Sequence, residues 1–182
     1  MAKQVPVLSS TVIYDGRVLG LKVDRVIEPG GVEAIRELVT HVGSVVVLPV
    51  LDDGRTVLVR QFRYATRKSL WELVAGSLEP GETARSAARR ELREETGYLA
   101  RRVHPVFSFY PSPGFLTERM HLLLAQGLIE GEAHPESDER IQVGRFTRPE
   151  LRRMLRAGKI EDGKTLVGLL WLLSSARRRS PR

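Results

Sequence analysis

Three glutamates near the middle of the chain have the spacing needed to bind a metal ion from one helix. Glu91, Glu94 and Glu95 stand at positions i, i+3 and i+4. At about 100° per residue they fall within roughly a third of the circumference of an α-helix. Carboxylates this close repel one another unless a positive charge lies over them. Hard divalent cations such as Mg²⁺ prefer oxygen ligands, so the strip predicts a metal site.

The residues around these glutamates predict a loop, a helix and a helix stop. Pro80-Gly81 indicates a turn, so residues 76–81 are expected to form a loop. Glu82 and Thr83 are expected to open the helix, with the acid at its positive N-terminal end. Gly97 is a suitable residue for the helix stop.

One stripe of the predicted helix is apolar and the opposite stripe is charged. Ala84, Ala88 and Leu92 repeat every four residues and are expected to be buried against a sheet. Arg90 lies one turn before Glu94 and can orient that carboxylate. The carboxylates are therefore expected on the helix face that points away from the core.

Residues 76–98 resemble the Nudix box, G-x5-E-x7-R-E-U-x-E-E-x-G-U, at every defined position, with Leu92 and Tyr98 at the two U positions. A glutamate-rich helix face alone is usually only solvated, but the complete pattern is far more specific. The resemblance implies an α+β fold, the Nudix α/β/α sandwich with a mixed sheet.

The same resemblance assigns roles to individual residues. It implies that Glu91 and Glu95 are the main metal ligands, that Glu94 assists, and that the backbone carbonyl of Ala75 completes the set. Glu94 and Arg90 are then also catalytic candidates. The expected cofactor is Mg²⁺, with Mn²⁺ as the alternative; such cations neutralise phosphate oxygens and lower the pKa of water. Nudix proteins hydrolyse nucleoside diphosphates linked to another moiety, which the box does not identify.

A segment after the box resembles a subgroup of the family. Ser112-Pro113-Gly114-Phe115 followed by Glu118 is similar to the loop of ADP-ribose pyrophosphatases and related nucleoside diphosphate sugar hydrolases. Pro113 lies sixteen residues beyond Gly97, which is the spacing in this subgroup. The resemblance assigns Pro113 and Gly114 to substrate binding. The alternative is a rigid turn without a ligand, because proline and glycine are ordinary turn residues.

Residues 134–143, HPESDERIQV, resemble the acidic loop that delivers a catalytic glutamate in the subgroup. On that match Glu139 is the candidate general base or additional metal ligand. A neighbouring acid of the subgroup falls on Ser137, so Glu136 or Asp138 could substitute for it. The alternative for each of these acids is a solvated loop position.

Two further residues are assigned to the substrate by resemblance. Arg63, in VRQFR, would hold the diphosphate with bidentate hydrogen bonds, whereas its alternative is a charge on a strand surface. Glu72 matches a glutamate in the E-x-P-A-G motif of the subgroup. Val74 replaces the usual proline of that motif, which loosens the substrate assignment. Trp71 is expected in the core or an interface rather than stacked on a base.

The chain is expected to divide into three parts. Residues 8–27 alternate around Asp15-Gly16, which predicts a hairpin. Residues 32–40 could form a short helix or a strand, and a strand is favoured because the segment lies between strands. Residues 1–42 then form a small antiparallel sheet, 43–176 the Nudix domain and 177–182 a basic tail. By resemblance the small sheet exchanges across a homodimer, and Val23 is a candidate for contact with the base.

The second part is expected to contain several strands and two further helices. The expected strands cover residues 45–51, 56–63, 70–75, 101–110, 120–125 and 141–146, and the expected helices 149–157 and 164–175. Residues 127–140 are expected to form an acidic loop.

Composition limits the class of protein. The chain has 182 residues, 42% hydrophobic and 28% charged, which suits one sizeable globular domain. The absence of cysteine fits a reducing cytoplasm, and neither a signal peptide nor a membrane span is expected. The net charge is +7, and Arg177, Arg178, Arg179 and Arg182 supply four of these charges. Such an end is usually a solvated terminus, so nucleic-acid binding is not expected.

The expected function is therefore metal-dependent hydrolysis of ADP-ribose, or of a related nucleoside diphosphate sugar, to a nucleoside monophosphate and a sugar phosphate. One alternative is a Nudix hydrolase of another nucleoside diphosphate derivative, such as a dinucleoside polyphosphate or NADH. A second alternative is a Nudix module that binds ADP-ribose without cleaving it.

Overall fold

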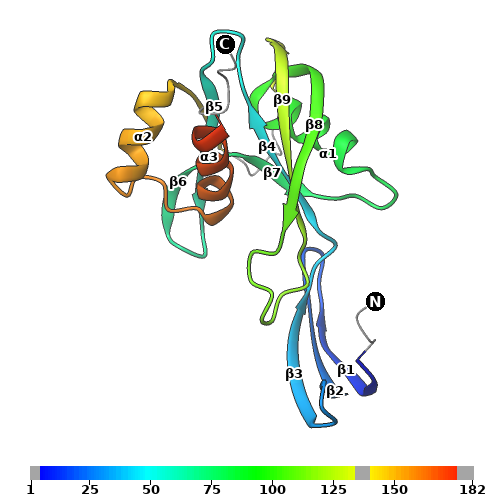
Figure 1. Cartoon of the computed structure of the whole chain (residues 1–182). Coiled ribbons are helices and arrows are strands. Elements are labelled where there is room, and N and C mark those ends of the chain that lie inside the picture. Colours follow the sequence, from blue (N-terminus) through cyan, green and yellow to red (C-terminus); the bar gives the residue numbers. More distant parts are fainter. Residues whose placement is uncertain (1–4, 134–139, 176–182) are drawn as a thin grey trace, which may run out of the picture. The chain divides into compact units, whose positions relative to one another are not determined.

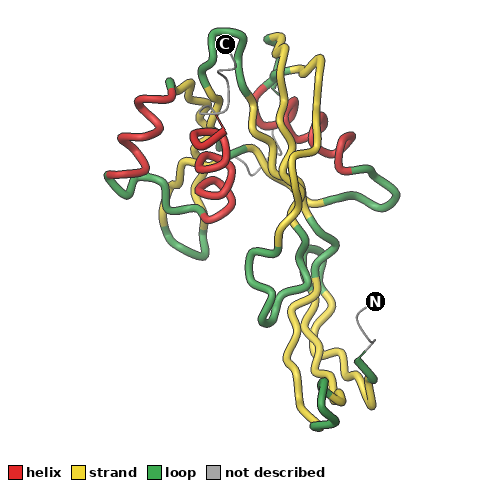
Figure 2. Tube along the Cα trace, viewed as in Figure 1, coloured by secondary structure: helices red, strands yellow, loops and turns green. Residues whose placement is uncertain are grey.

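The computed structural model describes residues 5–133 and 140–175, which form two compact units. The first unit contains residues 5–43 and 109–120, and the second contains the other described residues (Figure 1). Figure 2 shows that the helices of the described chain all belong to the second unit.

The first unit is built on a three-stranded antiparallel sheet. Its strands β1 (Val7–Asp15), β2 (Gly20–Ile27) and β3 (Glu33–Thr40) lie in the order β1-β2-β3. This confirms both the predicted hairpin and the strand expected over residues 32–40. Gly30 and Gly31 join β2 to β3 with φ angles of 99° and 84°, which glycine adopts without steric cost. Every residue of β1 is exposed.

Residues 109–120 belong to this unit because they pair with the end of β3. The Val39 N–H donates to the Phe115 carbonyl at 2.8 Å, and the Thr117 N–H donates to the Val39 carbonyl at 3.0 Å. Val39 and Leu116 form a parallel bridge. The loop that contains Pro113 and Gly114 is therefore fixed to a strand far earlier in the chain.

The second unit contains two sheets and three helices. The four-stranded sheet has the order β7-β4-β9-β8, with β4 (Ser44–Pro49), β7 (Val74–Ser77), β8 (Leu99–Phe109) and β9 (Met120–Ile129). The three-stranded sheet has the order β10-β5-β6, with β5 (Thr56–Arg63), β6 (Lys68–Glu72) and β10 (Gln142–Phe146). The helices are α1 (Ala84–Thr96), α2 (Arg148–Arg156) and α3 (Gly163–Ser175).

Strand β4 lies at the centre of the second unit, as its continuous apolar run predicts. All six of its residues are buried. Helix α1 packs on β7 and β4, and α3 packs on β4 and β6. In Figure 1, α1 and α3 lie on opposite sides of the four-stranded sheet. The result is the expected α+β arrangement with a mixed sheet, preceded by the small antiparallel sheet.

Helix α1 begins and ends close to the predicted positions, with a cap at each end. Thr83 is the N-cap: its Oγ1 accepts from the Ser86 N–H at 3.2 Å, and the Ser86 Oγ accepts from the Thr83 N–H at 3.0 Å. Gly97 ends the helix with φ 75°, and its N–H donates to the Arg93 carbonyl at 2.8 Å.

Two expectations about this unit are wrong. Glu95 does not point away from the core; its residue is only 6% exposed, because it follows Leu92 by three positions and shares that face of α1. The loop expected from residue 127 begins later, since β9 continues to Ile129. Gly127 stays in the strand with φ 63°, as glycine can at an irregular strand position. Within the described residues, no helix has both the length and the apolarity required to span a membrane.

Candidate active site

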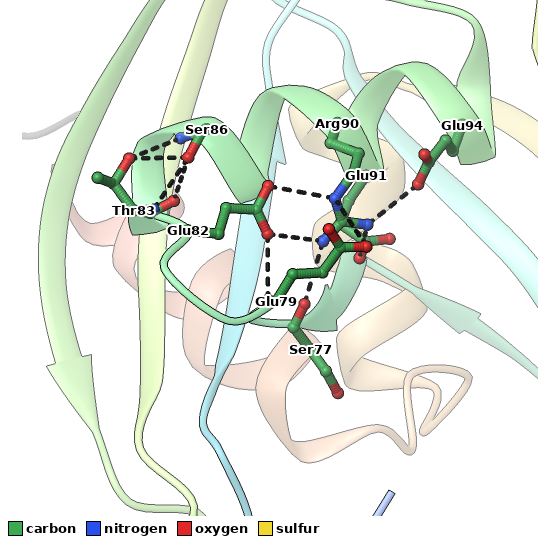
Figure 3. A network of polar contacts seen from close by, with 8 residues as sticks. All are labelled: Ser77, Glu79, Glu82, Thr83, Ser86, Arg90, Glu91 and Glu94. Atoms are coloured by element: carbon green, nitrogen blue, oxygen red, sulfur yellow. Dashed lines mark hydrogen bonds and ion pairs between the residues drawn. The ribbon is translucent and has the colours of Figure 1, made fainter. Parts of the chain in front are cut away.

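Arg90 lies at the centre of a cluster of carboxylates on α1 and on the loop before it. Its Nη2 donates to Glu82 Oε2 at 2.9 Å, and its Nη1 donates to Glu91 Oε1 at 2.7 Å and to Glu94 Oε2 at 3.1 Å. Nη2 also donates to the Ser77 carbonyl at 3.1 Å, at the end of β7 (Figure 3). One guanidinium therefore holds three carboxylates and one strand end together.

Electrostatics stabilise the ionised forms of Arg90 and Glu82 in this cluster. The Glu82 carboxylate, and after it Glu91, raises the pKa of Arg90 above its ordinary value, against the opposing effect of burial. In return, the hydrogen bonds from Arg90 lower the pKa of the Glu82 carboxyl. Glu82, Glu91 and Glu94 against Arg90 leave the cluster with a negative charge, which suits a cation.

Gly76 of β7 lies close against the Glu91 carboxylate. A Cβ atom on residue 76 would overlap the carboxyl group of Glu91. Glu95 approaches the same strand one residue earlier, where its Oε1 accepts from the Ala75 N–H at 3.3 Å. The structure thus brings Ala75, Gly76, Glu91 and Glu95 together, as the box predicts.

These residues fit a hard divalent cation by their chemistry. Glu91, Glu94, Glu95 and the Ala75 carbonyl supply only oxygen donors, and the missing side chain of Gly76 provides the space in which the Glu91 carboxyl lies. As placed in the described part of the chain, no three metal-binding side chains converge on one point. Glu91 and Glu94 are instead both directed at Arg90.

Arg63 and Glu72, both predicted to bind substrate, are paired with each other. Arg63 donates to the two Glu72 carboxylate oxygens from Nε and Nη2, at 2.8 Å each. Glu72 is only 1% exposed, whereas the Arg63 side chain is 41% exposed. Of these two residues, only Arg63 is substantially exposed, so it is the one that can meet a ligand.

The pair is ionised because a second cation, Lys164 of α3, also contacts Glu72. Burial alone would raise the pKa of the Glu72 carboxyl, but Arg63 and Lys164 outweigh that effect and lower it. Glu72 in turn raises the pKa of Arg63, and the Glu95 carboxylate adds to this effect from α1. Arg63 is thus electrostatically coupled to the glutamate helix.

The remaining predicted residues belong to the first unit, to β6 or to the part of the chain outside the described residues. Pro113 and Gly114 are exposed in a turn of the first unit, in which the Leu116 N–H donates to the Ser112 carbonyl at 3.0 Å. Val23 lies in β2 of the same unit. Trp71 is half-buried rather than part of the buried core, and it packs edge-to-face on Phe146 with ring centroids 4.9 Å apart.

Glu136, Asp138 and Glu139 lie outside the described residues, as does the basic tail. The chain that leads toward them leaves β9 beside the end of α1. A Cβ on Gly97 would lie 2.6 Å from the Gly131 carbonyl oxygen.

Sequence reasoning missed two members of the site. Glu82 was expected only to open the helix, yet it is a principal partner of Arg90; its place in the box is the signal that could have revealed it. Lys164 carries no such signal, because it contacts a residue 92 positions away.

Comparison with known proteins identifies the family. The family model described as "NUDIX domain" matches residues 40–167. The chain is 37% identical over 162 residues to the ADP-ribose pyrophosphatase of Bacillus subtilis (strain 168), with 88% of each chain covered. It is 35% identical over 167 residues to the ADP-ribose pyrophosphatase of Mycobacterium tuberculosis (strain ATCC 25618 / H37Rv), covering 90% of this chain and 80% of that one. The protein belongs to the Nudix hydrolase family.

Two further similarities complete the comparison. The chain is 39% identical over 162 residues to the "Methanol dehydrogenase activator" of Bacillus methanolicus, with 88% of each chain covered. A crystal structure described as an ADP compounds hydrolase superposes with a TM-score of 0.83 and 19% identity, covering 98% of both chains. At that identity the structural likeness supports the fold alone.

Proposed function

We propose that this Nudix hydrolase cleaves the diphosphate of ADP-ribose, or of a related nucleoside diphosphate sugar, to a nucleoside monophosphate and a sugar phosphate. The observation that carries the proposal is the approach of two box glutamates to β7: Glu95 accepts from the Ala75 N–H, and the Glu91 carboxyl lies in the space left by Gly76. The curated relatives named as ADP-ribose pyrophosphatases support the choice of substrate class.

The carboxylates of α1 and the Ala75 carbonyl would hold the cation, Mg²⁺ or Mn²⁺. When bound, such an ion neutralises phosphate oxygens and lowers the pKa of the water bound to it toward neutrality. Arg90 forms ion pairs with both Glu91 and Glu94 and so offsets the repulsion between their carboxylates.

Arg63 would bind the diphosphate. Glu72 takes one N–H from Nε and one from Nη2, which leaves Nη1 outside this pair, and the Arg63 side chain is 41% exposed. A guanidinium whose plane is already fixed loses little side-chain entropy when it donates a hydrogen bond to a phosphate oxygen. Glu139 is proposed as the general base or as an additional metal ligand.

A homodimer formed through the first unit is also part of the proposal. Strand β1 pairs with β2 along one edge and is exposed at all of its residues. Five of these residues are large and apolar: Val7, Leu8, Val12, Ile13 and Tyr14. An edge strand with such side chains suits a second copy of the same sheet.

A substrate panel tests the reaction. The purified protein is incubated with Mg²⁺ and ADP-ribose, ADP-glucose, GDP-mannose, NADH or diadenosine polyphosphates, and the nucleotides are separated by chromatography. The expected result is AMP from ADP-ribose, formed faster than the products of the other compounds. Preference for another compound would overturn the substrate assignment, and binding of ADP-ribose without cleavage would indicate a binding module.

A further inference from the structure

The N-terminal end of α3 places a lysine ammonium against the buried carboxylate of Glu72. Asp162 caps this helix: its Oδ2 accepts from the Thr165 N–H at 2.9 Å and from the Thr165 hydroxyl at 2.6 Å. Its other oxygen, Oδ1, accepts from Lys164 Nζ at 2.9 Å. Lys164 also donates to Glu72 Oε2 and is only 11% exposed, so its ammonium is fixed between two carboxylates.

The same carboxylate of Glu72 sets the orientation of Arg63. Two parallel hydrogen bonds to a planar guanidinium fix both its plane and its rotation. Those bonds can hold Arg63 in place only if the carboxylate is itself fixed. Glu72 is fixed by Lys164, which is the second cation on Oε2.

The charges along this chain of contacts alternate. Asp162, Lys164, Glu72 and Arg63 carry negative, positive, negative and positive charge in order, and only the last is substantially exposed. The set is neutral as a whole. Without the lysine, the two carboxylates would be balanced by the Arg63 guanidinium alone, which would leave less of its positive charge for a diphosphate.

The helix end also fixes the strand segment that leads to the metal ligands. The Leu73 N–H donates to Thr165 Oγ1 at 2.7 Å, and both groups are buried. Two residues further along, the Ala75 N–H donates to Glu95. The segment from Glu72 to Ala75 is therefore bound on one side by α3 and on the other by α1.

We propose that Lys164 is a positioning residue for substrate binding, which acts through Glu72 on the guanidinium of Arg63. This inference rests on the proposed function, because it takes Arg63 to be the ligand of the diphosphate. Lys164 itself touches no substrate in this scheme. Its effect should therefore depend entirely on the presence of Arg63.

A double-mutant cycle tests this dependence. Lys164→Met removes the ammonium and keeps the length of the side chain. In the otherwise unchanged enzyme we expect KM for ADP-ribose to rise about tenfold, as for loss of one charge-assisted interaction, with kcat within about threefold. In an Arg63→Ala background the same substitution should change KM by less than about twofold. Lys164→Arg should restore most of the lost affinity.

The matched control is Lys68→Met. Lys68 forms an ion pair with Glu161 at 2.6 Å, but both side chains are exposed, so its loss should change KM by less than about twofold. Circular dichroism checks folding of every variant. If Lys164→Met does not fold, Glu72→Gln combined with Lys164→Met removes both charges together, and this double variant should show the same dependence on Arg63.

The results that overturn the proposal are distinct from failure of the proposed function. An unchanged KM, or an equal rise in KM with and without Arg63, would refute the positioning role. An enzyme that prefers another diphosphate substrate would contradict only the substrate assignment, and the cycle would then be measured on that substrate. An enzyme that cleaves no diphosphate would refute both.

Discussion

Replacing Gly76 with alanine should lower the catalytic rate strongly while changing the stability of the fold little. The added Cβ would lie well inside the normal contact distance to the Glu91 carboxyl, which must withdraw by at least about 1 Å. Because that group is the end of a flexible side chain, the free energy of unfolding should change by no more than about 1 kcal/mol. Misplacement of a reacting group by about 1 Å costs roughly 100-fold in rate, so kcat/KM should fall by about that factor.

The measurements are kcat/KM for ADP-ribose over a range of Mg²⁺ concentrations and urea unfolding of the same preparations. Gly163→Ala is the matched control, since a Cβ at that position meets no atom within 4 Å. It should leave kcat/KM within about twofold, and the free energy of unfolding within about 1 kcal/mol, of the values for the unsubstituted protein. If Gly76→Ala kept kcat/KM within about threefold, the close fit of Glu91 against β7 would not matter for the reaction, and the reasoning would be wrong.

Three further predictions concern single residues. Glu95→Gln should lower kcat at least about 100-fold while the protein stays folded, because the proposed metal site loses a charge and the side chain keeps its shape; intact turnover would exclude Glu95 as a ligand. Glu72 has a lowered pKa, so its contribution to stability is complete above about pH 4.3 and is lost as pH falls through the lower folded value. Glu72→Gln should therefore flatten the acid limb of stability against pH, as measured by urea unfolding; an unchanged slope would contradict this. Val12→Asp should convert a dimer to a monomer in light scattering, and no change in mass would place any interface elsewhere.

The local features of the site were predictable because they follow from helix periodicity and capping. The glutamate spacing, the loop at Pro80-Gly81 and the stop at Gly97 all come from a single stretch of chain, and α1 lies where these signals indicate. The burial of Glu95 was missed because a carboxylate was taken as a surface residue. Its position relative to Leu92 already indicated the buried face.

Contacts between distant segments were not predictable from periodicity. The sequence assigned Glu72 to the substrate by resemblance, whereas the structure surrounds its carboxylate with Arg63 and Lys164. Residue types alone allow many pairings of lysines with glutamates, and only the packing of α3 on β6 selects this one. The pairing of residues 109–120 with β3 is non-local in the same way.

Two independent constraints act on residue 97, its backbone conformation and the space around it, and each excludes different residue types. The left-handed backbone at φ 75° would tolerate asparagine as well as glycine. The Gly131 carbonyl oxygen would lie 2.6 Å from a Cβ on residue 97, so it leaves no room there for any side chain. The end of α1 and the chain leaving β9 are thus in backbone contact and cannot shift separately. The position of the α1 glutamates therefore also depends on β9, a strand that supplies none of the proposed metal ligands.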